Sequence, residues 1–286
     1  MRIEYQAHAK VNLTLHITGR RPDGYHTLES VMQTVTLADR LVFTRADAGL
    51  TLACDDPSLP TGPDNLVVRA AQALRHHVGR PELAAHIALE KRIPAGAGLG
   101  GGSSDAAATL LGLGELWGLG LEPADLVPVA AGLGSDVPYF LYGGIAVVRG
   151  AGEQVEPVPM VPPWLHLVIA RPDFPISTAQ VYRRYDELGL PEQDQLATAP
   201  LLAALEQGHP ESIAAALHND LEQAVLPFAP EVAKVREALL SAGCLAALLC
   251  GSGSAVFGLC RDEDHAQQVE RDTAHLPWRV RVLSWP

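Results

Sequence analysis

A run of glycines constrains this chain more than any other part of its sequence. Residues 94–105 read PAGAGLGGGSSD, with five glycines, and the next six residues, AAATLL, are strong helix formers. Glycine adopts positive φ without steric cost, so such a loop can turn successive backbone N–H groups toward one bound anion. The helix that follows adds the positive end of its dipole at the same place. The segment therefore predicts a phosphate site. A flexible loop without a ligand is the alternative, and it would leave the entropy cost of ordering the glycines unexplained.

The common phosphate loops do not fit this segment. Gly96, Gly98 and Gly101 satisfy G-x-G-x-x-G, but the dinucleotide version needs a second strand after the helix, and the sequence there, LEPADLVPVAAGLG, is typical of a helix. A Walker A loop needs a lysine after its glycines, and a protein kinase needs His-Arg-Asp and Asp-Phe-Gly segments; the sequence has none of these. Another class of nucleotide loop is required.

Strand and helix patterns occur in blocks, without strict alternation. Apolar and polar residues alternate over 9–17, which is typical of a half-buried strand, and Asp23-Gly24 marks a turn before a second extended segment at 31–45. Asp64 is a candidate N-cap for a helix over 66–78. Further strands are predicted at 86–93, 145–150, 164–170, 245–251, 255–260 and 279–284, and further helices near 123–132, 179–188, 199–207, 210–225, 229–243 and 263–275. This order indicates an α+β protein with two lobes.

A proline-rich segment, VEPVPMVPP at 155–163, is a candidate linker between the lobes. We therefore expect an N-terminal domain over residues 1–155 and a C-terminal domain over 156–286.

Charge and cysteine content exclude several classes of function. The chain carries 21 Lys+Arg and 33 Asp+Glu, a net charge of −12, which argues against binding to nucleic acid or to an anionic membrane surface. No apolar run approaches the roughly 20 residues of a spanning helix, and the charged start MRIEYQAHAK is unlike a signal peptide. The four cysteines have no C-x-x-C spacing, so neither a zinc site nor a disulfide framework is predicted. A reduced, cytoplasmic protein is expected.

Three charged residues stand out in patterns that suit chemistry. Asp136 lies in the loop GLGSDVP, which could present a carboxylate to a cleft, although a turn or N-cap aspartate is an equal alternative. Lys10 shares a strand face with Asn12, where a lysine that only faces solvent is the alternative. Lys91 lies just before the glycine-rich loop, where it could contact a nucleotide or equally be a solvated edge lysine.

The motifs together resemble the GHMP kinases. Residues 94–104 resemble the second motif of that family, and CGSGSAVFG at 250–258 resembles the third. Four further segments resemble the branch of the family that phosphorylates a polyol linked to cytidine diphosphate: residues 9–30, 64–71, 134–140 and 219–222. The resemblance implies a first lobe like ribosomal protein S5 domain 2 and a ferredoxin-like second lobe. It also implies ATP and Mg²⁺ as cofactors and a small-molecule acceptor, in a monomer or homodimer that binds neither nucleic acid nor membrane.

Roles for individual residues follow from the same resemblance. Lys10 and Asp136 are the implied catalytic pair. The implied substrate-binding residues are Asn12, Tyr25, His26 and, from a looser match, Tyr182, with Tyr25 stacking on the cytosine and His26 bonding to its edge. Ser103 or Ser104 is the implied route to Mg²⁺. The implied ATP-binding residues are Asn65, Lys91, Pro94, Ala95, Gly96, Ala97, Gly98, Leu99, Gly100, Gly101, Gly102, Ser103 and Ser104. Asn65 has helix initiation as its alternative.

Two other functions remain as alternatives. One is another GHMP kinase, such as a homoserine kinase, with the same ATP chemistry. The other is a noncatalytic nucleotide-binding regulator on the same scaffold, which would not need both Lys10 and Asp136.

Overall fold

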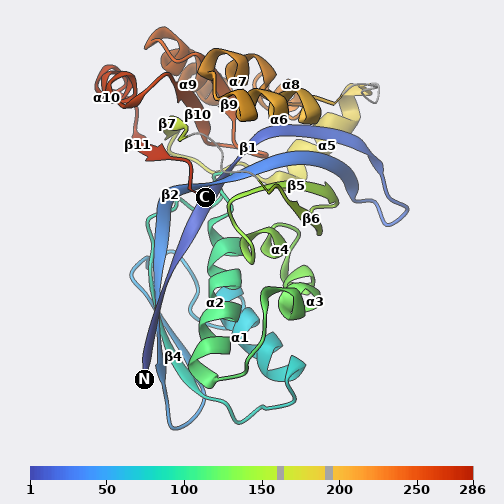
Figure 1. The fold of residues 1–286 in the computed structure, drawn as a ribbon, viewed down its shortest axis with the longest axis vertical. Coiled ribbons are helices and arrows are strands. Elements are labelled where there is room, and N and C mark those ends of the chain that lie inside the picture. Colours follow the sequence, from blue (N-terminus) through green and yellow to red (C-terminus); the bar gives the residue numbers. More distant parts are fainter. Residues whose placement is uncertain (160–163, 191–195, 286) are drawn as a thin grey trace. The chain divides into compact units, whose positions relative to one another are not determined.

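The computed structural model describes residues 1–159, 164–190 and 196–285 (Figure 1). The chain forms two compact units, each assembled from separate segments. The first unit contains Met1–Ala9, Leu37–Pro94 and Gly100–Gly143, and the second contains Lys10–Thr36, Ala95–Leu99 and Gly144–Pro286. The predicted continuous domains, 1–155 and 156–286, stay a prediction.

The first unit packs helices around the end of a β-sheet. Strand β4 (Ala85–Glu90) pairs antiparallel with the Arg40–Arg45 part of β2 (His26–Arg45) and parallel with β3 (Leu50–Cys54). The four helices of the described part of this unit are α1 (Leu66–His77), α2 (Gly101–Trp117), α3 (Pro123–Leu133) and α4 (Val137–Phe140). Helix α1 packs against α2 and α3, and α2 packs against α4.

The core of the first unit follows from two periodicities. On β4 every second side chain is buried, including Ile87 and Leu89. On α1 the buried stripe contains Val67, Ala71 and Leu74, at the spacing of one helix face. Burial of these apolar side chains supplies the main stabilisation of the unit.

The second unit contains a four-stranded antiparallel sheet. Its strand order is β11 (Trp278–Leu283), β7 (His166–Arg171), β10 (Val256–Cys260) and β9 (Ala246–Leu249). Helices α9 (Pro230–Ser241) and α10 (Glu263–Asp272) pack against it.

The remaining strands of the second unit pair with the long N-terminal strands. The first residues of β2 pair antiparallel with β5 (Ile145–Gly150), which pairs with β6 (Gln154–Pro157). Strand β1 (Arg2–Arg20) pairs in parallel with β8 (His218–Asn219). The other helices are α5 (Thr178–Leu188), α6 (Thr198–Gln207), α7 (Pro210–Ala216) and α8 (Glu222–Val225). The mixed α+β class is confirmed. None of the described helices has the length and apolar character that a membrane crossing requires.

One predicted helix N-cap is wrong. The N-cap of α1 is Asn65, not Asp64: the Asn65 Oδ1 accepts the Val67 N–H at 2.9 Å, so its alternative role in helix initiation is confirmed. Helix α2 begins at Gly101, before the two serines, because Gly100 takes the N-cap position with φ +75°. Ser103 and Ser104 therefore lie in the first turn of the helix.

The predicted helices over 210–225 and 263–275 also differ from the structure. The first is interrupted, since the backbone of Leu217 is extended and His218–Asn219 pairs with β1. Buried polar bonds fix this interruption: the Asp220 Oδ2 accepts the Ile17 N–H at 2.7 Å. The second helix ends early, at Asp272.

Candidate active site

Residues 95–99 of the glycine-rich loop lie in the second unit against the loop after β9. Gly98 has φ +79°, and a Cβ placed on it would lie 1.9 Å from the carbonyl oxygen of Cys250. The Ala255 N–H donates to the Ala97 carbonyl at 3.1 Å. Only glycine permits this contact at residue 98, so the second and third predicted motifs are joined through their backbones.

Lys10 and Asn12 lie at the same place. The Lys10 Nζ donates to the Asn12 Oδ1 at 2.7 Å, and the Lys10 N–H donates to the Leu99 carbonyl at 3.0 Å. A Cβ placed on Gly251 would lie 3.2 Å from the Lys10 Nζ and 3.3 Å from the Gly98 carbonyl oxygen. The predicted shared strand face is therefore correct, and Lys10, residues 95–99 and the loop after β9 meet within the second unit.

Lys10 is not a solvating lysine. Its side chain and that of Asn12 are buried, and the Asn12 Nδ2 donates to the Ser30 Oγ at 2.8 Å. The Ser30 Oγ in turn donates to the Thr14 carbonyl. This chain of bonds fixes the amide of Asn12 with its oxygen toward Lys10, so the ammonium is held in one position.

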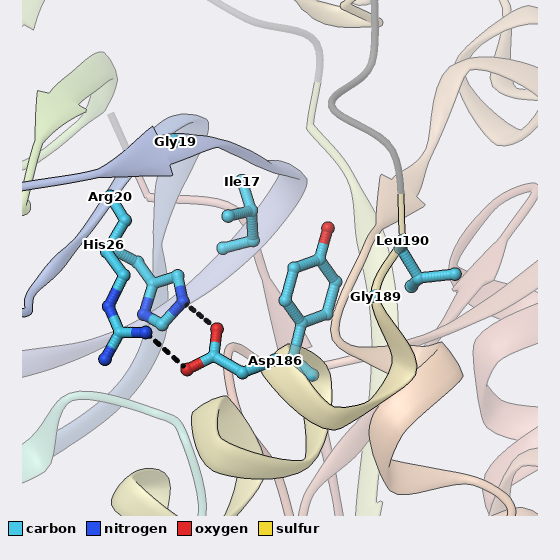
Figure 2. Close-up of a pocket in the computed structure, with 8 residues that line it drawn as sticks. Ile17, Gly19, Arg20, His26, Asp186, Gly189 and Leu190 are labelled. Atoms are coloured by element: carbon cyan, nitrogen blue, oxygen red, sulfur yellow. Dashed lines mark hydrogen bonds and ion pairs between the residues drawn. The ribbon is translucent and has the colours of Figure 1, made fainter.

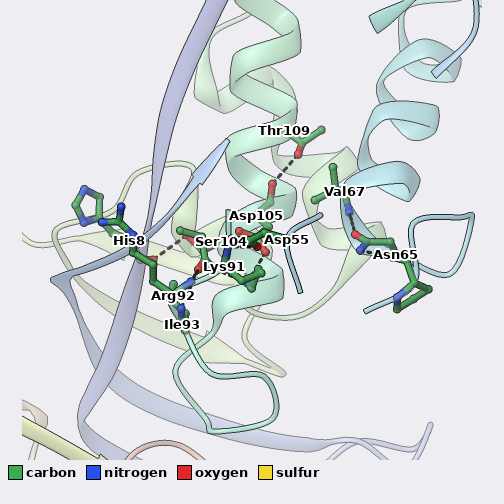
Figure 3. Close-up of polar contacts among 12 residues, drawn as sticks. His8, Asp55, Asn65, Val67, Lys91, Arg92, Ile93, Ser104, Asp105 and Thr109 are labelled. Atoms are coloured by element: carbon green, nitrogen blue, oxygen red, sulfur yellow. Dashed lines mark hydrogen bonds and ion pairs between the residues drawn. The ribbon is translucent and has the colours of Figure 1, made fainter. Parts of the chain in front are cut away.

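In the first unit a buried ion cluster lies beside the start of α2 (Figure 3). The Lys91 Nζ donates to the Asp39 carboxylate and, at 2.7 Å, to the Asp105 Oδ2. The Asp39 Oδ1 also accepts the Arg92 and Ile93 N–H groups at 2.5 and 2.8 Å. The cluster therefore fixes the backbone just before Pro94. Lys91 is not a solvated edge lysine, and its contact with ATP stays a prediction.

Burial raises the pKa of Asp105 to about 7, against the lowering effect of Lys91 and with a further raising effect from Asp39. Burial lowers the pKa of Lys91, but the two carboxylates outweigh it and the net pKa is raised. The Asp105 Oδ1 is buried without a hydrogen-bond partner among the described residues. In this cluster of one cation and two carboxylates, the Asp105 carboxyl group therefore loses its proton near neutral pH.

The predicted base and the predicted metal-binding hydroxyls also lie in the first unit. Asp136 is half-buried at the N-cap position of α4, and its side chain does not cap that helix. The Ser104 Oγ donates to the His8 carbonyl at 2.7 Å, whereas Ser103 is half-buried. The structure therefore assigns the Ser104 proton to the protein itself.

The predicted cytosine residues lie in the second unit, where His26 lines a pocket (Figure 2). The His26 Nε2 lies 2.6 Å from the Asp186 Oδ1, and the Arg20 Nη1 lies 3.2 Å from the Asp186 Oδ2. The Tyr182 ring stacks on His26 with centroids 4.9 Å apart. The described lining residues are Ile17, Gly19, Arg20, His26, Tyr185, Asp186, Gly189 and Leu190. Tyr25 and Tyr182 are not among them, and Tyr25 is 65% exposed.

Sequence reasoning missed Asp39, Asp105, Arg20 and Asp186. Asp39 interrupts an apolar strand, TLADRLVF, and the chain has only three lysines, so a buried partner for Lys91 could have been inferred. Asp186 carried no such signal, because it lies in a helix among other charged residues, YRRYDEL. Its importance appears only when α5 is placed beside His26.

Comparison with known proteins identifies the family. The model of the GHMP kinases N terminal domain matches residues 65–144, and that of the GHMP kinases C terminal domain matches 201–273. The 4-diphosphocytidyl-2-C-methyl-D-erythritol kinase of Pelotomaculum thermopropionicum is 48% identical over 92% of this chain and 91% of that protein. A crystal structure of 4-(cytidine 5'-diphospho)-2C-methyl-D-erythritol kinase matches with a TM-score of 0.85 and 37% identity, covering 99% of this chain and all of the other (100%).

A homoserine kinase structure from Cytophaga hutchinsonii matches with a TM-score of 0.76 over 99% of this chain and 94% of the other, but at only 22% identity. That likeness shows the fold alone. The similarity to the cytidyl kinases extends over nearly the whole of both chains, at 48% and 37% identity. The chain therefore belongs to the 4-diphosphocytidyl-2-C-methyl-D-erythritol kinase family, within the GHMP kinases.

Proposed function

We propose that this protein transfers the γ-phosphoryl group of ATP to the 2-hydroxyl of 4-diphosphocytidyl-2-C-methyl-D-erythritol, in the non-mevalonate pathway to isoprenoid precursors. The family membership supports the substrate class. The observation that carries the chemistry is the convergence of Lys10, residues 95–99 and the loop after β9 in one unit. Such a convergence of an ammonium with two glycine-containing turns suits a triphosphate.

In this proposal the triphosphate is bound mainly by backbone. Gly96, Gly98 and Gly100 all have positive φ, a conformation that residues with a Cβ rarely adopt. Such a backbone can turn successive N–H groups toward one anion. The first turn of α2 supplies further unpaired N–H groups and the positive end of the helix dipole. The phosphoryl oxygens would thus meet fixed dipoles that need no reorganisation during the reaction.

Lys10 and Asp136 are proposed to handle the acceptor. Asp136 accepts the proton of the 2-hydroxyl as that oxygen forms its bond to the γ-phosphorus and the bond to the β-phosphate oxygen breaks. The Lys10 ammonium, oriented by Asn12, stabilises negative charge on the attacking oxygen. ADP and the phosphorylated acceptor leave.

Magnesium is proposed to arrive with ATP, where it would neutralise charge on the phosphates. Hydroxyl oxygens are suitable ligands for this hard cation, so the first turn of α2 fits the metal in donor chemistry. Ser103 is the better candidate of the two serines, because Ser104 already donates to His8. Ser104 could still offer a lone pair.

The decisive experiment measures ATP binding and turnover separately in the Asp136→Asn variant. Loss of the base should lower turnover by about 10²–10⁴ while ATP affinity stays near that of the wild type. Asp47→Asn, the same change in an exposed turn, is the matched control and should behave as the wild type. Turnover of Asp136→Asn within threefold of the wild type would remove Asp136 from the mechanism.

The choice of acceptor separates the alternatives. ADP release with the cytidyl acceptor but not with homoserine is expected. Release with homoserine alone would identify another GHMP kinase, and ATP binding without release with either would indicate a noncatalytic regulator. Residence in the cytoplasm, and a monomer or homodimer as the working assembly, are part of the proposal and rest on the sequence.

A further inference from the structure

The imidazole of His26 is held by a carboxylate, that of Asp186, which is not among the predicted substrate-binding residues. Asp186, on α5, faces His26 at the start of β2, with 2.6 Å between its Oδ1 and the His26 Nε2. Its other oxygen lies 3.2 Å from the Arg20 guanidinium. Figure 2 shows all three side chains at the pocket, with dashed lines joining His26 and Arg20 to the two oxygens of Asp186. The carboxylate therefore has both oxygens engaged by nitrogens.

This contact decides which nitrogen of His26 carries the proton. An ionised carboxylate can only accept hydrogen bonds, so the nitrogen beside it must donate. In the neutral ring the proton is then on Nε2, and Nδ1 is left as an acceptor. Among the described residues the structure shows no hydrogen bond from the protein to Nδ1. In this tautomer the His26 Nδ1 is a hydrogen-bond acceptor, whereas in the opposite tautomer it would be a donor.

Neighbouring contacts keep the arrangement in one geometry. The Tyr182 ring lies against the His26 ring at 28° between planes, which restricts rotation of the imidazole. The Arg20 Nε also donates to the Gly24 carbonyl at 3.2 Å, so the same arginine ties the 21–25 turn to the carboxylate. Asp186 is the common partner through which His26 and Arg20 are held.

Cytosine and uracil differ at the edge such an acceptor would contact. Cytosine presents an amino group at position 4, which donates, whereas uracil presents a carbonyl oxygen there, which accepts. An acceptor nitrogen pairs with the first and repels the second. The opposite tautomer, with the proton on Nδ1, would reverse this preference.

We propose that Asp186 is a positioning residue that selects cytosine over uracil by fixing the proton of His26 on Nε2. The inference rests on the proposed function, because it assigns the pyrimidine of that substrate to His26. Asp186 acts through His26 and makes no contact of its own with the base. Arg20 keeps the carboxylate oriented for this task.

The test compares kcat/KM for the cytidyl acceptor and for its uridyl counterpart in the wild type and in Asp186→Asn. An amide can accept from either ring nitrogen or donate to it, so this variant releases the tautomer while keeping the size of the side chain. We expect the ratio of the two kcat/KM values to fall about tenfold or more, with KM for ATP unchanged. Glu187→Gln removes a neighbouring exposed carboxylate from the same helix and should leave the ratio unchanged.

A nitrogen-detected NMR spectrum of His26, recorded above the pH at which the ring becomes neutral, gives a readout independent of catalysis. The wild type should show the proton on Nε2, and Asp186→Asn should show a mixture of tautomers. An equal fall in kcat/KM for both acceptors, or a wild-type ring protonated on Nδ1, would overturn the proposal. If the wild type used neither acceptor, the proposed function would fail, while the NMR result would still report on Asp186.

Discussion

Two charged clusters of this protein have similar composition and opposite surroundings. The cluster of Lys91, Asp39 and Asp105 in the first unit has side chains that are 8%, 0% and 5% exposed. The cluster of His26, Asp186 and Arg20 in the second unit has side chains that are 10%, 34% and 59% exposed. In each cluster one central side chain, Lys91 or Asp186, contacts two partners. This difference in exposure predicts that the first cluster acts in stability and the second in ligand recognition.

Burial determines what a charged cluster can contribute. In a site without water, the loss of one partner leaves the other charged groups without solvent or counter-charge. The buried cluster can therefore hold the backbone before Pro94, but removing a charged partner from it is strongly destabilising. At the surface, water replaces a lost partner at little cost in free energy. The exposed cluster therefore contributes little to the stability of the fold, and the geometry of its side chains can serve ligand recognition.

The largest effect is expected for Lys91→Met. This change removes the cation and leaves two buried carboxylates facing each other, so the free energy of unfolding at pH 7 should fall by about 3–5 kcal/mol. Denaturant unfolding measures it. Lys234→Met removes an exposed lysine and serves as the matched control, with little change expected. A loss below about 1 kcal/mol for Lys91→Met would show that the two clusters do not differ as their burial indicates.

The next effect, expected for Asp105→Asn, depends on pH. The pKa of Asp105 is raised to about 7 in the folded protein, so the neutral form is favoured by folding. Its contribution to stability is full below about pH 4 and is lost as the pH rises through about 7. Asparagine resembles the neutral acid at every pH. The free energy of unfolding of the variant minus that of the wild type should therefore rise over this range, by at most about 1.4 kcal/mol per pH unit.

Urea unfolding between pH 4.5 and 8 measures this difference. Asp47→Asn, the same substitution in an exposed turn, should give a constant difference from the wild type. A constant difference for Asp105→Asn as well would mean that this carboxyl group titrates normally in the folded protein.

The sequence predicts much of the fold and of the phosphate loop because those features are local. Strand alternation at 9–17, the turn at Asp23-Gly24 and the positive φ of Gly96, Gly98 and Gly100 all depend on neighbouring residues. The contact of Lys10 with Asn12 follows from a period of two along one strand. In each case the physical cause lies within a few positions of the residue concerned.

What the sequence did not predict depends on partners far along the chain. The interruption after Ala216 is fixed by bonds from β1, and a local helix pattern cannot reveal it. Lys91 finds its counter-charge 52 positions earlier, at Asp39, and His26 finds Asp186 160 positions later. Side-chain roles in both clusters therefore required the tertiary structure.

The smallest effect on stability is expected for Asp186→Ala, and it separates the clusters most sharply. The carboxylate is one-third exposed, and both its partners can be solvated after its loss, so the free energy of unfolding should change by less than about 1 kcal/mol. The same protein sample should nonetheless discriminate poorly between cytidyl and uridyl acceptors, because the His26 ring has lost the group that orients its proton. Thermal unfolding and steady-state kinetics on one preparation measure both properties. If Asp186→Ala destabilised the fold as strongly as Lys91→Met, the cluster would be a structural tie, and its effect on acceptor choice could not be separated from loss of the folded pocket.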